Sequence, residues 1–153
     1  MITLSQLRRC DLASLEELYA HERAVSLPAG RYRGVPLARL ESSGARNPFW
    51  RLTQVPFSLA PFAVDFTARH WLFFHRLALG KFEPSVGASR WRETVTVRLD
   101  YSGSRLPAPV RNLLYDEVKP LSETLCLGLG GVNAPRGRGD HFFFALDRAD
   151  PRP

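Results

Sequence analysis

Cysteine is scarce in this 153-residue chain, and its pattern excludes several kinds of site. Cys10 and Cys126 lie far apart, without the neighbouring cysteines or histidines that zinc and redox motifs require. We therefore expect two buried thiols and no metal site. No cofactor is predicted either, but haem stays an alternative, because a single axial histidine such as His70 or His75 leaves no spacing signature.

Motifs for covalent catalysis, phosphate binding and secretion are missing as well. The chain has no G-x-S-x-G segment that would present a nucleophilic serine. Residues 128–131 are rich in glycine, but no helix pattern follows them, so close backbone packing explains them better than phosphate binding. The first nine residues contain no apolar run with a small-residue cleavage site, and we expect a cytoplasmic protein.

The chain is basic, but its charge is not concentrated. A formal charge of +6 and a pI near 10 make acidic partners worth considering. Most of the 21 basic residues are arginines that occur singly, and only Arg136 and Arg138 form a local cluster. We therefore expect no nucleic-acid partner.

Length and aromatic content suit a domain that encloses a small molecule. A chain of 153 residues corresponds to one domain, residues 1–153, with enough buried surface to form a cavity without disulfides or metals. Ten Phe, four Tyr and three Trp provide large, flat contact surfaces for a pocket as well as for a core.

The N-terminal third predicts one helix and one strand. Residues 11–22 place four apolar side chains on one helical face, and either Asp11 or a capping box of Ser14 and Glu17 begins the helix. Residues 31–40 resemble a strand interrupted by Gly34 and Pro36, and the proline indicates an edge, a bulge or a strand start. Residues 46–54 show no clear pattern.

The strongly apolar stretch at residues 61–79 raises the question of a membrane span. Its five charged or titratable side chains make stable membrane insertion costly: Asp65, Arg69, His70, His75 and Arg76. We predict a buried or lid-like amphipathic helix here, with binding to a membrane surface as the alternative.

Residues 91–101 give the clearest strand. One predicted dry face carries Trp91, Glu93, Val95, Val97, Leu99 and Tyr101, and polar residues alternate with them. Such alternation is typical of an antiparallel sheet or barrel wall. Glu93 is the exception on this face, because a buried carboxylate needs a partner or a proton. It is either a strand-end residue that reaches solvent or a polar anchor inside a pocket.

Two further strands, residues 123–132 and 141–148, are apolar on both faces, as expected where a helix covers a sheet or a barrel closes. The basic loop between them, residues 133–140, is placed at a barrel rim. The predicted fold is mainly β with helices: an antiparallel lipocalin-like β-barrel with a short N-terminal helix and one longer apolar helix.

Short motifs carry a resemblance to a known family. The segment Gly30-Arg31-Tyr32-Arg33-Gly34 resembles the G-x-W-x-G signature that opens the first strand of lipocalin-like small bacterial β-barrel proteins, with Tyr32 in place of Trp. The segment Leu79-Gly80-Lys81-Phe82 resembles their W-x-G-K-x-F element, again without Trp. The C-terminal segments are similar to their closing strands: Tyr115-Asp116-Glu117, Leu127-Gly128 and residues 142–146. The resemblance implies a barrel whose cavity holds an apolar molecule, with Tyr32 at the closed end.

Two functions from different classes follow. The first is the binding of a small apolar or amphipathic ligand in a barrel cavity. The second is a barrel cyclase or isomerase that acts on a hydrophobic natural-product intermediate by acid–base catalysis. Its catalytic candidates are Glu93, Tyr101 and Glu117. The predicted ligand-binding residues are Tyr32, Trp71, His75, Phe82, Trp91, Glu93, Val95, Val97 and Tyr101.

Overall fold

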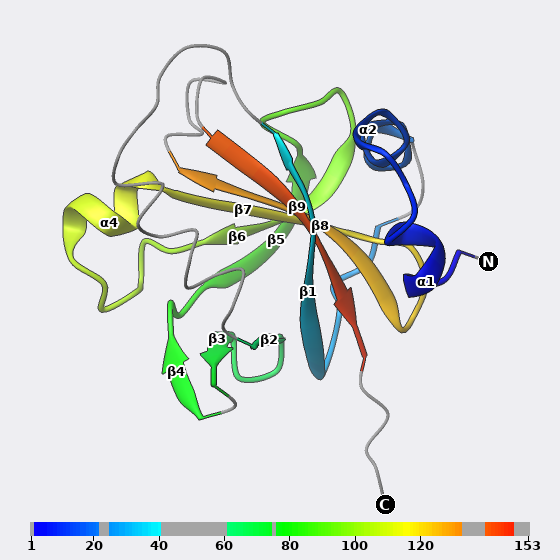
Figure 1. The fold of residues 1–153 in the computed structure, drawn as a ribbon. Helices are drawn as coiled ribbons and strands as arrows, with labels where there is room; N and C mark the ends of the chain where they lie inside the picture. Colours follow the sequence, from blue (N-terminus) through cyan, green and yellow to red (C-terminus); the bar gives the residue numbers. More distant parts are fainter. Residues whose placement is uncertain (1, 22–24, 41–60, 75, 133–139, 149–153) are drawn as a thin grey trace, which may run out of the picture.

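A single antiparallel sheet organises the protein (Figure 1). The computed structural model describes residues 2–21, 25–40, 61–74, 76–132 and 140–148. Within them the sheet has nine strands in the order β4-β3-β2-β1-β9-β8-β7-β6-β5. The strands are β1 Arg31–Leu40, β2 Phe62–Asp65, β3 His70–Phe73, β4 Leu77–Leu79, β5 Glu83–Ala88, β6 Val95–Asp100, β7 Leu114–Pro120, β8 Leu125–Val132 and β9 Asp140–Asp147. The helices are α1 Leu4–Leu7, α2 Leu12–Ala20 and α4 Ala108–Leu113.

The sheet curls into a partly open barrel. Its two edge strands, β4 and β5, are consecutive in the chain and are joined by residues 80–82 alone, so the edges must approach each other. The N–H of Phe82 donates to the carbonyl oxygen of Arg69 at 2.9 Å, and the Arg69 guanidinium pairs with the Glu83 carboxylate. These contacts tie the β2–β3 turn to the start of β5. The predicted class, a β-barrel with helices, is confirmed.

Two apolar clusters lie on opposite faces of the sheet. The inner cluster, inside the curl, consists of Tyr32, Phe62, Val64, Phe66, Trp71, Phe82, Val97, Leu99, Tyr101, Val118, Cys126, Phe144 and Leu146. The outer cluster lies between the sheet and the helices α1 and α2, and it consists of Leu7, Leu15, Tyr19, Val35, Leu125, Leu127, Leu129, Phe143 and Ala145. Because β8 and β9 carry apolar side chains to both clusters, they lack an alternating pattern, as predicted.

Glycines in β8 make room for inner side chains. A Cβ atom added at Gly128 would lie 2.1 Å from the ring of Phe144, and one added at Gly130 would lie 2.5 Å from the carboxylate of Asp116. Residues 128–131 therefore serve close packing across the strands, as the sequence indicated.

The predicted helix at residues 61–79 is wrong. This stretch forms the strands β2, β3 and β4 instead. The Asp65 carboxylate accepts the N–H of Ala68 at 2.8 Å, and Arg69 adopts a φ of 59°, so the chain reverses where a helix would continue. The many apolar residues in this stretch hid an alternation of buried and less buried positions, in which Phe62, Val64 and Trp71 point into the inner cluster. His70 consequently lies on β3.

The clearest predicted strand is shorter than expected. The strand β6 begins at Val95, and the chain before it turns, so the predicted dry face holds for Val97, Leu99 and Tyr101 only. Glu93 is exposed and Val95 is 45% exposed. The opposite face is not uniformly wet either, because Thr96 is buried there and its Oγ1 lies 3.1 Å from the Tyr19 hydroxyl of α2.

Other predicted elements agree with the structure. The strand at residues 31–40 is β1, with an irregular register between Pro36 and Ala38 opposite β9. The helix is α2, and Asp11 caps it by accepting the N–H of Ser14 at 2.9 Å. Residues 46–54 and most of the basic loop at 133–140 lie outside the described residues. No sequence pattern predicted β5, and only the resemblance of residues 115–117 to a closing strand pointed to β7.

Candidate functional site

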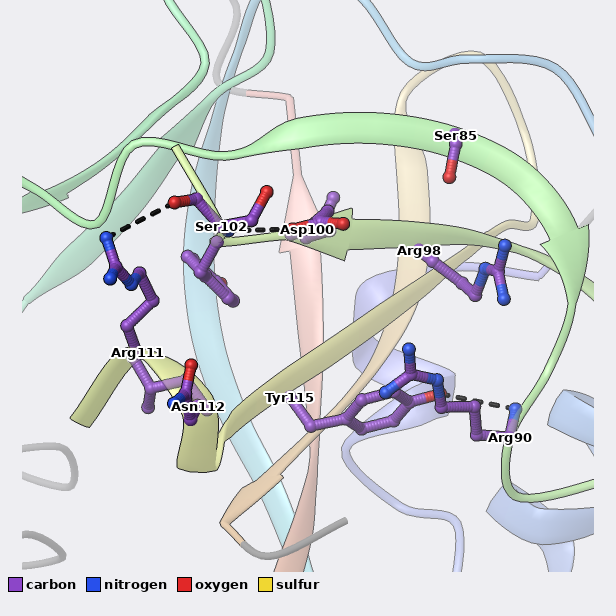
Figure 2. Close-up of a pocket in the computed structure, with 11 residues that line it drawn as sticks. Ser85, Arg90, Arg98, Asp100, Ser102, Arg111, Asn112 and Tyr115 are labelled. Carbon is purple, nitrogen blue, oxygen red and sulfur yellow. Dashed lines mark hydrogen bonds between the residues drawn. The ribbon is translucent and has the colours of Figure 1, made fainter. Parts of the chain in front are cut away.

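A polar recess lies where β5, β6, β7 and α4 meet (Figure 2). Its volume is about 200 Å³. It is lined by Ser85, Arg90, Arg98, Leu99, Asp100, Tyr101, Ser102, Arg111, Asn112, Leu114 and Tyr115. We call it the arginine recess, because Arg90, Arg98 and Arg111 contribute three guanidinium groups from three different elements.

No ion pair in the described part of the chain neutralises the arginines of the recess. Among the described residues the ion pairs are Arg33–Asp147, Arg69–Glu83 and Arg92–Glu16, and none of them includes a recess arginine. Asp100 is the one carboxylate in the described lining. Hydrogen bonds from Ser102 hold the pKa of Asp100 below its usual range, and Arg90 and Arg98 act in the same direction. The lining therefore carries more positive than negative charge.

Each arginine is held by neighbouring groups. The Arg90 guanidinium lies 5.3 Å from the centre of the Tyr115 ring, a cation–π contact. Arg98 packs against β5, where a Cβ added at Gly87 would lie 3.1 Å from its guanidinium. Arg111 donates to the carbonyl oxygens of Ser102 at 3.3 Å and Ser104 at 3.1 Å.

A buried carboxylate supports the recess from the outer face of the sheet. Glu117 of β7 is fully buried, and it accepts hydrogen bonds from the Tyr19 hydroxyl at 2.6 Å, the Ser89 hydroxyl at 2.5 Å and the Arg90 N–H at 2.7 Å. The same Arg90 N–H also lies 3.2 Å from the Tyr115 hydroxyl oxygen. Burial raises the pKa of Glu117, and its three donors and the charge of Arg98 oppose that rise.

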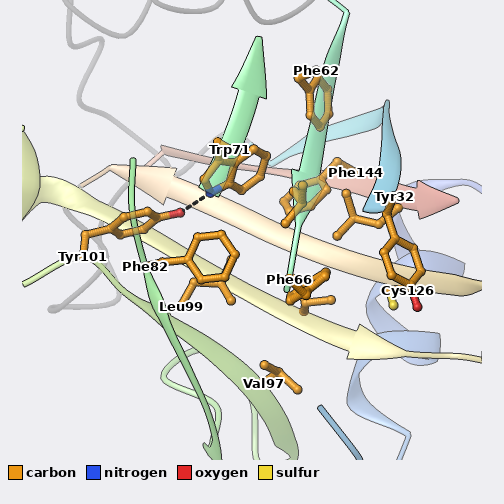
Figure 3. Packing of buried hydrophobic residues seen from close by; sticks show 13 residues of the cluster. Tyr32, Phe62, Phe66, Trp71, Phe82, Val97, Leu99, Tyr101, Cys126 and Phe144 are labelled. Carbon is orange, nitrogen blue, oxygen red and sulfur yellow. Dashed lines mark hydrogen bonds between the residues drawn. The ribbon is translucent and has the colours of Figure 1, made fainter. Parts of the chain in front are cut away.

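A second buried acid, Asp116, lies on the inner face. The indole N–H of Trp71 donates to the Tyr101 hydroxyl oxygen at 2.5 Å (Figure 3), and that hydroxyl donates in turn to Asp116. Burial raises the pKa of Asp116 to about 7, and the single hydrogen bond from Tyr101 opposes the rise only in part. Burial also raises the pKa of Tyr101 well above its usual value, so the hydroxyl remains protonated.

The predicted ligand-binding residues fall into three groups. Tyr32, Trp71, Phe82, Val97 and Tyr101 come together in the inner cluster, where each is at most 5% exposed. Trp91 is half-buried and packs against the outer cluster, while Glu93 and Val95 are exposed. His75 lies outside the described residues. The structure thus gathers five of the nine predicted positions into packed core.

The predicted catalytic residues are separated as well. Glu93 is exposed and lies two residues before β6 begins, so the structure places it in solvent and gives no support to the pocket-anchor interpretation. Tyr101 belongs to the inner face and Glu117 to the outer face. Of these three, only Tyr101 lines the recess. The three recess arginines were missed because they occur singly in the sequence, and only the path through β6, α4 and β7 brings them together.

Metal binding, a reactive cysteine and a membrane-spanning helix have little support in the part of the chain that the structure describes. No group of three or more His, Cys, Asp or Glu side chains there could hold a metal ion. Burial raises the pKa of the Cys126 thiol to about 12, whereas Cys10 is only half-buried, contrary to prediction. No described helix has the length and apolar character needed to cross a membrane.

Comparison with known proteins supports the fold and leaves the function open. No known family and no curated protein matches the chain. A crystal structure of a protein from Thermomonospora curvata is similar, with a TM-score of 0.53 and 19% sequence identity. The similarity covers 96% of this chain and 93% of that one. At this identity the match speaks for a shared fold alone.

Proposed function

We propose that this protein binds a small amphipathic molecule whose anionic group sits in the arginine recess. The observation that carries the proposal is the convergence of Arg90, Arg98 and Arg111 on one recess that has Asp100 as its one described carboxylate, with none of the three arginines in an ion pair within the described chain. Guanidinium groups offer planar pairs of N–H donors that match carboxylate, sulfonate and phosphate oxygens. The hydroxyls of Ser85 and Ser102 and the amide of Asn112 add further hydrogen-bonding groups.

The size and lining of the recess favour an amphipathic ligand. Its volume of about 200 Å³ is smaller than that of pockets that enclose drug-sized ligands, roughly 300–1,000 Å³, so it suits one anionic group and the atoms next to it. Leu99, Leu114 and the Tyr115 ring supply apolar contact beside the arginines. A ligand with an anionic group and a flat apolar part uses both.

Binding accounts for the arrangement better than catalysis does. Asp116 has a pKa near neutrality, but it is enclosed with Tyr101 in the inner cluster, whereas the arginine recess is open to solvent. The resemblance of residues 30–34 to the G-x-W-x-G signature favours a ligand-binding barrel too. In our proposal the ligand is held at the end of the β6–β7 pair, and the apolar interior remains packed.

Fluorescence titration with two matched dyes tests the proposal. The anionic dye 8-anilinonaphthalene-1-sulfonate and the neutral dye N-phenyl-1-naphthylamine share an aromatic body and differ in the sulfonate. We expect the protein to bind the anionic dye at least about tenfold more tightly, which is about 1.4 kcal/mol. Arg98→Gln should weaken anionic-dye binding by about tenfold, because it removes the charge and the fork of N–H donors of the guanidinium.

A matched variant separates recess binding from general attraction. Arg31→Gln removes the same charge from an exposed position on β1, outside the recess, and should leave the affinity within about twofold. Equal binding of the two dyes would favour an apolar site elsewhere. Equal losses in Arg98→Gln and Arg31→Gln would overturn the assignment to the recess.

A further inference from the structure

We infer that Glu117 is a positioning residue for ligand binding: through the turn at residues 89–92 it fixes Arg90 over Tyr115 at the arginine recess. This inference rests on the proposed function. Glu117 does not line the recess itself, so any effect on a bound anion must pass through another residue.

The contacts of Glu117 define the turn. One carboxylate oxygen accepts the N–H of Arg90 at 2.7 Å, and the other accepts the hydroxyl of Ser89 at 2.5 Å. The Ser89 hydroxyl oxygen in turn accepts the N–H groups of Trp91 at 3.0 Å and Arg92 at 3.2 Å. Four consecutive residues therefore take their position from one carboxylate.

The turn is also tied to α2, which limits its motion further. The Tyr19 hydroxyl donates to Glu117 at 2.6 Å, and Arg92 pairs with Glu16 of α2 at 2.9 Å. Trp91 packs edge-to-face on Tyr115, with ring centres 5.8 Å apart. Arg90 is thus presented on a rigid support, and a preorganised side chain loses less entropy when it binds an anion.

Protonation of Glu117 should weaken this support. Three donors point at its two oxygens, an arrangement that fits a carboxylate, and a protonated acid cannot accept all three equally well. Burial raises its pKa, which brings protonation closer to mildly acidic pH. The charged or titratable groups around it are Tyr19 from α2, Arg90 from the turn, Arg98 from β6, and Tyr115 and Lys119 from its own face of β7.

Asp100 gives the opposite pH dependence and so serves as an internal contrast. Its pKa lies below the usual range, and losing its negative charge in acid would strengthen anion binding at the recess. A fall in affinity as the pH is lowered therefore has the sign expected of Glu117, whereas protonation of Asp100, or of Asp116 with its pKa of about 7, removes a negative charge and would raise the affinity. The sulfonate of the anionic dye stays ionised throughout a titration from about pH 8 to about pH 5, so the probe adds no titration of its own.

The test is a double-variant cycle with 8-anilinonaphthalene-1-sulfonate. We expect Glu117→Gln to weaken dye binding by about fivefold at pH 8 and to flatten the pH profile. Because Glu117 acts through Arg90, the same substitution should change binding by less than about twofold in an Arg90→Gln background. Glu93→Gln is the matched control, since it removes an exposed carboxylate from the same segment.

Each result has one meaning. If Glu117→Gln does not fold, Ser89→Ala removes one donor of the same turn and should reproduce the loss of affinity more weakly. Additive effects of Glu117→Gln and Arg90→Gln, or an unchanged pH profile, would overturn the positioning role while leaving the recess as the binding site. Failure of the unsubstituted protein to bind the anionic dye would overturn the proposed function itself.

Discussion

Asp116 and Glu117 are neighbours on β7, yet they meet different surroundings because successive strand residues point to opposite faces. Asp116 lies on the inner face among aromatic side chains, with the Tyr101 hydroxyl as its hydrogen-bond donor. Glu117 lies on the outer face beneath α2, with three donors and the nearby charge of Arg98. Burial is the largest influence on both acids and raises both pKa values. At Glu117 three donors and the charge of Arg98 oppose that rise, whereas at Asp116 one donor does.

The two faces also differ in what they can support. The inner face is packed by apolar contacts around one acid, Asp116, whose pKa is about 7, and this packing suits a stable core. The outer face is built from a polar network that reaches the turn bearing Arg90, which suits a binding site. Three changes test this contrast.

The largest expected effect comes from placing a second acid on the inner face. Val97→Asp puts a carboxylate at a position that is 0% exposed, and it should lower the free energy of unfolding by about 4 kcal/mol or prevent folding. Val95→Asp is the control on the same strand, at a position that is 45% exposed, and should change stability by less than about 1 kcal/mol. Urea unfolding followed by circular dichroism measures both. Equal losses would mean that the inner face begins earlier than the structure places it.

The sequence predicted the class of fold because its strongest local patterns match the burial that the structure shows. The end of β6 and the residue after it alternate at Val97, Leu99 and Tyr101 because one face of this segment is packed in the inner cluster. The strands β8 and β9 carry apolar residues on both faces because both of their faces are packed. The failure at residues 61–79 has a clear cause. Most positions there are apolar, so neither a period of two nor a period of 3.6 stands out.

The candidate site was far less predictable than the fold. Residues that meet at the recess are separated in sequence by a strand and a helix, and arginines that occur singly give no local signal. Glu117 was named as a candidate acid, but its role depends on Tyr19 and Ser89, which lie 98 and 28 positions away. The strand order and the packing of α2 on the sheet bring such distant partners together, and short sequence motifs do not reveal either.

The second prediction concerns the pH dependence of the inner face. Burial raises the pKa of Asp116 from 3.8 to about 7, so the folded protein binds a proton that the unfolded chain releases. The resulting stabilisation is fully present below about pH 4, falls as the pH rises and is lost above about pH 7. With about 1.4 kcal/mol for each unit of pKa difference, the loss is roughly 4 kcal/mol. Asp116→Asn should remove most of this slope, as measured by urea unfolding at a series of pH values.

The contrast with Asp100 sharpens this prediction. The pKa of Asp100 is lowered, so Asp100→Asn should leave the decline between about pH 5 and pH 7 intact. Part of the slope should persist in Asp116→Asn, because burial raises the pKa of Glu117 in the same direction. An Asp116→Asn variant with the full slope of the unsubstituted protein would show that burial does not raise the pKa of Asp116.

The smallest of the three effects concerns the polar network of the outer face. Lys119 is 0% exposed, and its ammonium group donates to the carbonyl oxygens of Tyr19 and His21 at 2.9 Å each, where α2 ends, and to the Thr94 hydroxyl. Lys119→Met keeps an unbranched side chain, one heavy atom shorter, but leaves these acceptors without that donor, so stability should fall by about 1–3 kcal/mol. Lys81→Met makes the same chemical change at an exposed position and should alter stability by less than about 0.5 kcal/mol. Hydrogen exchange adds a readout specific to the outer face: protection should fall in α2 and the turn at residues 89–92, and remain in β8 and β9. A uniform loss of protection, or none in α2, would mean that Lys119 stabilises the sheet as a whole and does not hold the helix against it.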